Sequence, residues 1–269
     1  MSNEASGHDI AGLTWDQVKE RLAGGAAAIL PIGAGAKQHG LHMTMATDQV
    51  FAEYFSRALA GRSDALIWPT LTYGAYPAFV AYAGSVSLSN ATFQAVVTEI
   101  ADSLLGFGAR RVLILDTGLS TIAPVDAAIR ASHDPSLIRH LKVFAGPRFR
   151  ETVRKLQGQP YGSHADEMET SLMLAIAPEL VDMARAAPCP FSPTGPSPGA
   201  LSPDDPSSPT YAPSGSFGDP TLASADKGSQ LLAAILGDLM EMAKAPGGVT
   251  RSGRGRRRRP PAGKLRDNP

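Results

Sequence analysis

Four short apolar runs alternate along the chain with segments of helical pattern, and this alternation restricts the fold more than any other feature. None of the runs shows the apolar–polar alternation of a half-exposed strand, so each predicts a strand buried on both faces. Buried strands separated by helices are typical of a mostly parallel sheet with helices on both faces, and the sequence therefore predicts an α/β fold. The predicted strands are residues 26–32, 65–68, 112–115 and 141–145.

Residues that commonly cap helices precede several apolar stripes of helical spacing. Thr14 and Gln17 have the spacing of a capping box, which predicts a first helix that ends near Gly24. Asp48 and Asn90 are expected to cap the second and third helices. Further helices are expected near residues 125–130, after 164–171 and after 219–220.

Two segments of unusual composition interrupt or follow this pattern. Residues 188–220 hold ten of the chain's 22 prolines among serine, glycine and aspartate, a composition that favours no packed element. We therefore expect a single domain over residues 12–245 with a disordered insertion at about 188–218, followed by a basic disordered tail at 246–269.

Charge and cysteine content limit the expected environment and partners. The net charge is zero, but residues 251–269 carry eight Lys or Arg and one Asp. Because no aromatic residues lie among these arginines, nucleic acid is not an expected partner. Cys189 is the single cysteine, so an internal disulfide is excluded. The polar start of the chain and the absence of an apolar run of about 18 residues predict no signal peptide, no membrane span and a cytoplasmic protein.

Two histidines and an aspartate follow the first predicted strand within ten residues. His39, His42 and Asp48 would lie beyond the carboxyl end of a strand, where open α/β sheets bind ligands. Imidazole and carboxylate groups are natural ligands of zinc or manganese. Loop histidines that hydrogen-bond to the backbone are commoner, however, and the spacing by itself leaves both interpretations open.

A second polar group, residues 164–171, leads into an apolar helical stripe. Glu169 lies beside the face that Met168 and Leu172 share. A carboxylate at that position could enter a cleft and act as a general base. The alternative is that the acidic residues here simply favour the first turn of a helix through its dipole.

These segments together resemble the creatininase (creatinine amidohydrolase) family. The resemblance covers most of residues 14–240, in order, and implies a three-layer α/β/α sandwich with a mostly parallel central sheet, commonly assembled as a homo-hexamer. The matching segments are Leu30-Pro31-Ile32-Gly33, His39-Gly40-Leu41-His42 with Asp48, Gly84-Ser85-Val86-Ser87-Leu88, residues 112–115, residues 164–171, Phe217-Gly218-Asp219-Pro220 and residues 223–228.

The resemblance also implies a two-metal centre that activates water to open a cyclic amide. His39 and Asp48 match a metal-binding histidine and the aspartate that bridges both metals. Lys37 stands at the position of a glutamate ligand, and an ammonium group cannot bind a metal without losing its proton. Gly118 and Ser120 stand at two further ligand positions, in a motif that aligns with residues 116–121.

The third family motif, His-Ala-x-x-x-Glu-Thr-Ser, is complete here, and by the resemblance His164 and Glu169 contact the substrate and transfer protons. We expect Lys37 to occupy the space of the first metal and to pair with Asp48, and we count it with His164 and Glu169 as catalytic. These expectations favour a hydrolase of a non-peptide C–N bond in a small cyclic amide or formamide, with zinc or manganese if a metal is kept. The alternative is a catalytically silent creatininase-fold protein that forms an oligomer or binds a ligand.

Overall fold

Four parallel strands form the central sheet of the computed structural model, which describes residues 8–189 and 199–245. The order across the sheet is β2-β1-β3-β4, and every connection between successive strands runs through a helix. Ile29 pairs with Ile67 on one side and with Leu113 on the other, so the first strand is central. The strands are β1 (Ala27–Ile32), β2 (Ala65–Ile67), β3 (Val112–Asp116) and β4 (Ile138–Lys142).

Three predicted strands are confirmed to within one residue at each end, and the fourth begins three residues earlier than predicted. β4 is an edge strand in which Arg139, His140 and Lys142 are only half-buried. Polar side chains can remain accessible at a sheet edge, so an uninterrupted apolar run does not mark this strand. The predicted range 141–145 was wrong for that reason.

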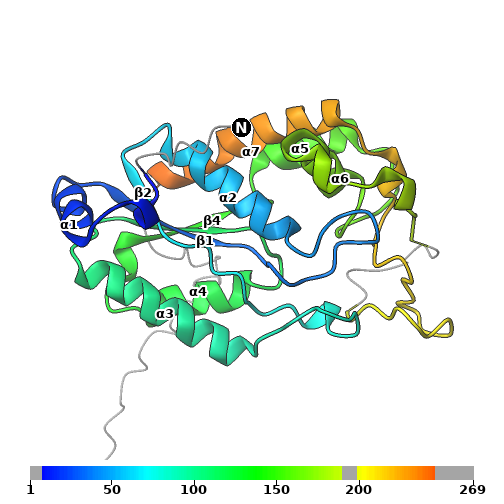
Figure 1. The fold of residues 1–269 in the computed structure, drawn as a ribbon, viewed down its shortest axis with the longest axis horizontal. Helices are drawn as coiled ribbons and strands as arrows, with labels where there is room; N and C mark the ends of the chain where they lie inside the picture. The colour runs from blue at the N-terminus through cyan, green and yellow to red at the C-terminus, as the bar shows by residue number, and fades with distance from the viewer. Residues whose placement is uncertain (1–7, 190–198, 246–269) are drawn as a thin grey trace, which may run out of the picture.

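Helices cover both faces of the sheet and give three layers (Figure 1). Ala27 and Ile29 belong to the core between the sheet and α2 and α7, whereas Ala28 belongs to the core on the opposite face. The expected α/β/α sandwich is therefore confirmed. One face carries α2 (Thr47–Ala60), α5 (Pro147–Leu156), α6 (Glu167–Ile176) and α7 (Ala225–Lys244), and the other carries α1 (Trp15–Ala23), α3 (Asn90–Gly106) and α4 (Ile122–Ala131).

Short 3-10 turns lie in the loops between these elements. They are Ile10–Gly12, Pro77–Phe79, Pro135–Leu137, Pro178–Leu180, Met183–Arg185 and Pro220–Leu222. Within the residues that the structure describes, no helix has the length and apolar character that crossing a membrane would require.

The first helix starts as predicted and the second does not. Thr14 and Gln17 form the expected capping box, and α1 ends just before Gly24. α2 begins at Thr47, so Asp48 lies in its first turn and is not the cap. Both carboxylate oxygens of Asp48 face other side chains of the site described below, which leaves neither for the helix start.

Serines replace the predicted caps of two later helices. Ser89 caps α3 through its side chain, so Asn90 is the first helical residue rather than the cap. Ser224 caps α7, after the separate turn Pro220–Leu222 that Asp219 caps. Serine, asparagine and aspartate side chains serve a helix start about equally well, so the sequence locates a cap only to within a few residues.

The proline-rich segment is packed in part, which corrects the prediction of an insertion without packed structure. The backbone N–H of Phe217 donates to the carbonyl of His164 at 2.8 Å, so this segment is tied to the body of the fold. A few apolar residues can pack when the rest of the fold already offers an apolar surface, and composition averaged over 33 residues hides them. The predicted tail, residues 246–269, lies outside the described residues. The buried apolar residues of the segment are Cys189, Leu201, Ala212 and Phe217.

Helix α5 was not predicted, and a buried carboxylate of α7 holds its N-terminus. Asp238 is 1% exposed and accepts the backbone N–H groups of Arg148 at 3.2 Å and Phe149 at 2.9 Å. The approach is close, because a Cβ on Gly146 would lie 2.0 Å from Oδ2 of Asp238. Asp238 thus fixes α5 relative to α7.

Removing this carboxylate should destabilise the fold. Asp238→Ala leaves two N–H groups at the start of α5 without their acceptor, and we expect the free energy of unfolding to fall by about 1–3 kcal/mol. Glu241→Ala is the matched control, since Glu241 also pairs with Arg148 from α7 but is exposed, and should cost less than about 1 kcal/mol. Urea denaturation followed by circular dichroism measures both. Equal losses in the two variants would show that Asp238 does not hold α5.

Candidate active site

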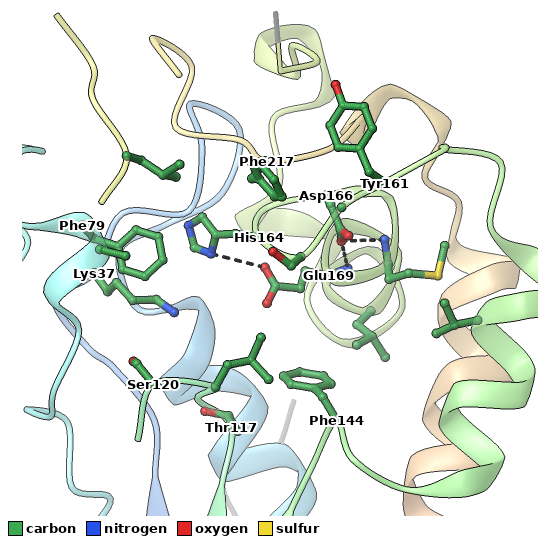
Figure 2. A pocket seen from close by; sticks show the side chains of 18 of the residues that line it. Lys37, Phe79, Thr117, Ser120, Phe144, Tyr161, His164, Asp166, Glu169 and Phe217 are labelled. Atoms are coloured by element: carbon green, nitrogen blue, oxygen red, sulfur yellow. Dashed lines mark hydrogen bonds and ion pairs between the residues drawn. The ribbon is translucent and has the colours of Figure 1, made fainter. Parts of the chain in front are cut away.

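The polar side chains singled out in the sequence meet at the carboxyl edge of the sheet. The loop after β1 carries Lys37, the loop after β3 carries Ser120, and the first turn of α6 supplies Glu169 (Figure 2). Gly33 permits the close passage of the first loop over α2, because a Cβ there would lie 2.3 Å from the backbone oxygen of Asp48. Parallel sheets place ligands at this edge.

An ion pair between Lys37 and Asp48 lies at the base of the site. Nζ of Lys37 is 2.6 Å from Oδ2 of Asp48, and the two side chains are 7% and 1% exposed. The ammonium group also lies 4.9 Å and 5.5 Å from the ring centroids of Phe79 and Tyr76. Burial alone would raise the pKa of Asp48, but Lys37 and His39 outweigh it and hold that pKa below its usual value. The expected contact of Lys37 with Asp48 is present.

His39 contacts the other oxygen of the same carboxylate. Its Nε2 lies 3.0 Å from Oδ1 of Asp48, and its Nδ1 lies 3.1 Å from the backbone oxygen of Lys37. Burial lowers the pKa of His39, while Asp48 opposes this shift and Lys37 adds to it. His42 instead contacts the hydroxyl of Thr170 at 2.8 Å, and burial lowers its pKa to about 4. Of the two loop histidines, it is therefore His39 that contacts Asp48.

Glu169 borders the site as a largely uncharged carboxyl group. Burial raises its pKa to about 8, Lys37 partly opposes this shift, and Asp166 and Asp48 add to it. Oε2 of Glu169 accepts the backbone N–H of Ala165 at 2.6 Å. Ala165 has a φ of 47°, a left-handed conformation that costs a non-glycine residue about 1 kcal/mol or more. The structure thus keeps a strained residue that directs an N–H group at this carboxyl group.

His164 lies beside Glu169 with one ring nitrogen available. Its Nε2 is 2.9 Å from the backbone oxygen of Gln38, and because a carbonyl only accepts, this nitrogen is assigned the proton. Its Nδ1 is 3.7 Å from Oε2 of Glu169, beyond hydrogen-bond distance. Burial, with help from His39 and Lys37, lowers the pKa of His164 well below its usual value. The imidazole is therefore neutral at physiological pH.

These groups open into a cavity of about 800 Å³. Figure 2 shows Lys37 and Glu169 pointing toward each other across this space, with Thr117 and Phe144 on one side of it. A cavity of this size can take a small organic molecule. The prediction that Glu169 borders a cleft is confirmed. The apolar residues of the cavity wall are Ala78, Phe79, Leu119, Phe144, Phe149, Val153, Tyr161, Met168, Leu172, Leu201 and Phe217.

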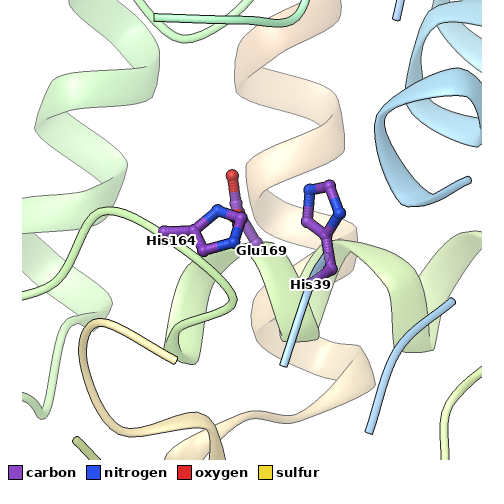
Figure 3. A group of neighbouring side chains, drawn as sticks. All are labelled: His39, His164 and Glu169. Atoms are coloured by element: carbon purple, nitrogen blue, oxygen red, sulfur yellow. The ribbon is translucent and has the colours of Figure 1, made fainter. Parts of the chain in front are cut away.

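Three side chains of the site form a candidate metal-binding group. One ligand atom each from His39, His164 and Glu169 can be chosen so that all lie within 4.8 Å of one another (Figure 3). Imidazole and carboxylate ligands suit zinc or manganese. Both ring nitrogens of His39 already have partners, so an ion bound by His39 would displace either Asp48 or the carbonyl of Lys37.

The positions that the family resemblance assigns to a two-metal centre do not fit one. The ammonium group of Lys37 already occupies one oxygen of Asp48. Ser120 donates its hydroxyl to a backbone carbonyl at 2.6 Å. Gly118 has no side chain, and a Cβ there would lie 2.3 Å from the hydroxyl of Thr121. The remaining ligands are too few for two metal ions.

The cavity walls were not identified from the sequence. Phe144 is the second residue after β4, and Phe149 and Val153 are four residues apart on α5, a spacing that places them on one helix face. That spacing was the sequence feature that could have predicted this part of the wall. It was weak because α5 is short and four of its ten residues are Arg or Lys.

Comparisons with known proteins find similar chains over nearly the whole described region. A family model named Creatininase and described as creatinine amidohydrolase matches residues 11–243. The chain is 31% identical over 242 residues to a creatinine amidohydrolase from Pseudomonas putida. This match covers 82% of this chain and 90% of that protein. It is 27% identical over 229 residues to a mycofactocin precursor peptide peptidase from Mycobacterium ulcerans (strain Agy99), with 78% and 81% covered.

Solved structures give the same result for the fold. A structure titled "Creatininase Mn" superposes with a TM-score of 0.74 at 27% identity and covers 87% of this chain and 96% of its own. A mutant creatininase of "Zn-Zn type" superposes with a TM-score of 0.71 at 27% identity, with 87% and 95% covered. The structural neighbours thus include forms named for manganese and for zinc.

The raised pKa of Glu169 predicts a change of stability with pH. The folded state holds a proton that the unfolded chain releases at the ordinary pKa of 4.5, so the stabilising contribution is complete below that pH and is lost as pH rises through about 8. Glu169→Gln cannot titrate. Its free energy of unfolding should therefore rise relative to the wild type by about 1–3 kcal/mol between pH 5 and pH 8, as measured by urea denaturation.

Glu179→Gln is the control, because Glu179 is exposed on a turn. The difference in free energy of unfolding between Glu179→Gln and the wild type should stay nearly constant over the same pH range. A constant difference for Glu169→Gln as well would contradict the raised pKa.

Proposed function

Because the chain belongs to the creatininase family, we propose that it is a hydrolase of a non-peptide C–N bond in a small cyclic amide or formamide. The observation that supports this most is that the ammonium group of Lys37 and the carboxyl group of Glu169 face one cavity. Both curated relatives have names that denote cleavage of a C–N bond, in creatinine for one and in a precursor peptide for the other.

In this proposal Lys37 binds the carbonyl oxygen of the amide. Its N–H groups would stabilise the negative charge that develops on this oxygen as water adds to the carbonyl carbon. Asp48 fixes the position of the ammonium group, and the rings of Phe79 and Tyr76 limit its contact with water. A fixed charge in such surroundings acts more strongly than one exposed to solvent.

Glu169 would move the proton. A carboxyl group whose pKa is about 8 is present in both protonation states near neutral pH. The ionised form accepts a proton from the attacking water as the C–O bond forms, and the protonated form returns that proton to the leaving nitrogen as the C–N bond breaks. His164, with its unprotonated Nδ1 beside Glu169, would accept a hydrogen bond from the water or the substrate.

We propose that this chemistry proceeds without a two-metal centre, since Lys37, Gly118 and Ser120 stand at positions that such a centre needs. A single zinc or manganese ion on His39, His164 and Glu169 is the metal-dependent alternative, supported by the proximity of their ligand atoms. In that case Glu169 would be a ligand and not the proton carrier.

A catalytically silent oligomeric or ligand-binding protein is the rival proposal, and the altered metal positions favour it. Assembly as a homo-hexamer and a cytoplasmic location also stay proposals. Analytical ultracentrifugation tests the first, and fractionation of cells tests the second.

Glu169→Gln should lower turnover by a factor of about 10² to 10⁴, because it keeps the size of the side chain but cannot carry the proton. Hydrolysis of a panel of cyclic amides and formamides, followed by chromatography, is the measurement, with Glu179→Gln as the control. We expect activity to survive treatment with a chelator. Unchanged turnover in Glu169→Gln would contradict the role of Glu169. Activity that a chelator removes and zinc or manganese restores would favour the single-ion alternative.

Lys37 should control metal affinity at Asp48. Lys37→Glu removes a positive charge that repels the metal ion and adds a carboxylate ligand. The affinity for zinc or manganese, measured by calorimetry, should rise at least about tenfold. Lys37→Met removes the charge without adding a ligand and separates the two effects. Equal and negligible binding by wild type, Lys37→Met and Lys37→Glu would show that Lys37 is not what excludes the metal.

A further inference from the structure

The cavity is larger than a bare five-membered cyclic amide needs. Its volume of about 800 Å³ lies in the upper part of the range of about 300–1,000 Å³ that is usual for sites of drug-sized ligands. The groups that the proposed reaction uses, Lys37, His164 and Glu169, account for only a small part of its lining. The rest of the cavity is therefore available to another part of a ligand.

Helix α5 and Phe144, in the loop between β4 and α5, supply an apolar wall that the fold itself does not cover. Phe149 and Val153 lie on one face of α5, and the ring of Phe144 is 5.5 Å from that of Phe149 between centroids. All three residues are half-buried rather than buried. An apolar group of a ligand that covers this wall would remove it from water, which favours binding.

Aromatic rings also lie on the opposite side of Glu169. In Figure 2, Phe217 and Tyr161 lie above Glu169 and Phe144 lies below it. The rings of Tyr161 and Phe217 are 5.8 Å apart between centroids. Aromatic rings favour planar partners, because these allow offset stacking or edge contacts over a large area.

A cationic ligand is disfavoured beside Lys37, because the facing carboxyl group of Glu169 is largely uncharged and does not offset the repulsion. The ammonium group of Lys37 faces the cavity, and Asp48, its partner, lies behind it. The carboxylate of Asp166 already accepts the N–H groups of Met168 and Glu169 and the side-chain amide of Gln159. A neutral amide oxygen is not repelled by this ammonium group and can accept a hydrogen bond from it.

We infer that the preferred substrate is a neutral amide that carries a planar apolar group of about the size of a benzyl group. The amide reaches Lys37 and Glu169, and the apolar group covers Phe144 and Phe149. This inference rests on the proposed function and narrows its substrate class from small cyclic amides in general to aryl-substituted ones.

Calorimetric titration with three probes tests the inference. Hydantoin is a neutral five-membered cyclic amide, 5-benzylhydantoin adds one benzyl group to it, and benzylguanidine carries the benzyl group on a cation. We expect 5-benzylhydantoin to bind about 10- to 100-fold more tightly than hydantoin, because the ring covers apolar area. It should bind at least about tenfold more tightly than benzylguanidine, which Lys37 repels.

Phe149→Ala removes one of the two aromatic rings of this wall and should reduce the advantage of 5-benzylhydantoin over hydantoin to about threefold or less. Affinity for hydantoin itself should change by less than about twofold. Phe107→Ala is the matched control, since Phe107 is 67% exposed after the last residue of α3 and does not border the cavity. If Phe149→Ala fails to fold, Phe149→Leu takes its place. Leucine keeps apolar bulk but loses the ring, so the advantage of 5-benzylhydantoin should be intermediate.

Equal or undetectable affinities for hydantoin and 5-benzylhydantoin would overturn the inference, and so would an advantage that persists unchanged in the Phe149 variants. Binding is read from calorimetry and hydrolysis from chromatography of the same mixtures, so the two proposals fail separately. Tight binding of 5-benzylhydantoin without hydrolysis would support the substrate class and contradict the hydrolase. Hydrolysis of hydantoin, with no tighter binding of 5-benzylhydantoin, would support the hydrolase and contradict the substrate class.

Discussion

The ion pair between Lys37 and Asp48 is the interaction on which the site depends. Both side chains are almost completely buried, and moving two charges out of water costs several kcal/mol per ion before any attraction is counted. The contact at 2.6 Å and the hydrogen bond from His39 offset that cost. Such a pair contributes little net stability, but removing one partner would leave an unpaired buried charge. Its presence is better explained by a need for a fixed positive charge at the cavity.

In the proposed reaction the ammonium group of Lys37 takes the place of a divalent ion, and this changes what the rest of the site must do. A metal ion lowers the pKa of bound water and so supplies its own nucleophile, whereas an ammonium group only donates hydrogen bonds and charge. In this proposal the general base is Glu169, whose pKa of about 8 suits proton transfer near neutral pH. The fold supports this carboxyl group through the strained backbone of Ala165, whose N–H it accepts.

Much of the fold could be predicted because apolar runs and helix stripes are local patterns, and the polar part of the site because its residues match the creatininase motifs. The apolar runs predicted β1, β2 and β3, and the place of Lys37 at a metal-ligand position of the family motif indicated its contact with Asp48. The wall of the cavity could not be predicted in this way. Phe149 reaches it only because Asp238, about ninety residues later, holds the start of α5, and Phe217 only because its segment packs beside His164. These contacts join distant parts of the chain and leave little local pattern.

Anomalous diffraction from crystals grown with manganese tests most directly whether Lys37 has taken the place of a metal ion at Asp48. The account predicts that Nζ of Lys37 stays within hydrogen-bond distance of Asp48 and that no anomalous peak lies within ligand distance of that carboxylate. A manganese peak at about 2.0–2.2 Å from an oxygen of Asp48, with the side chain of Lys37 displaced, would contradict it.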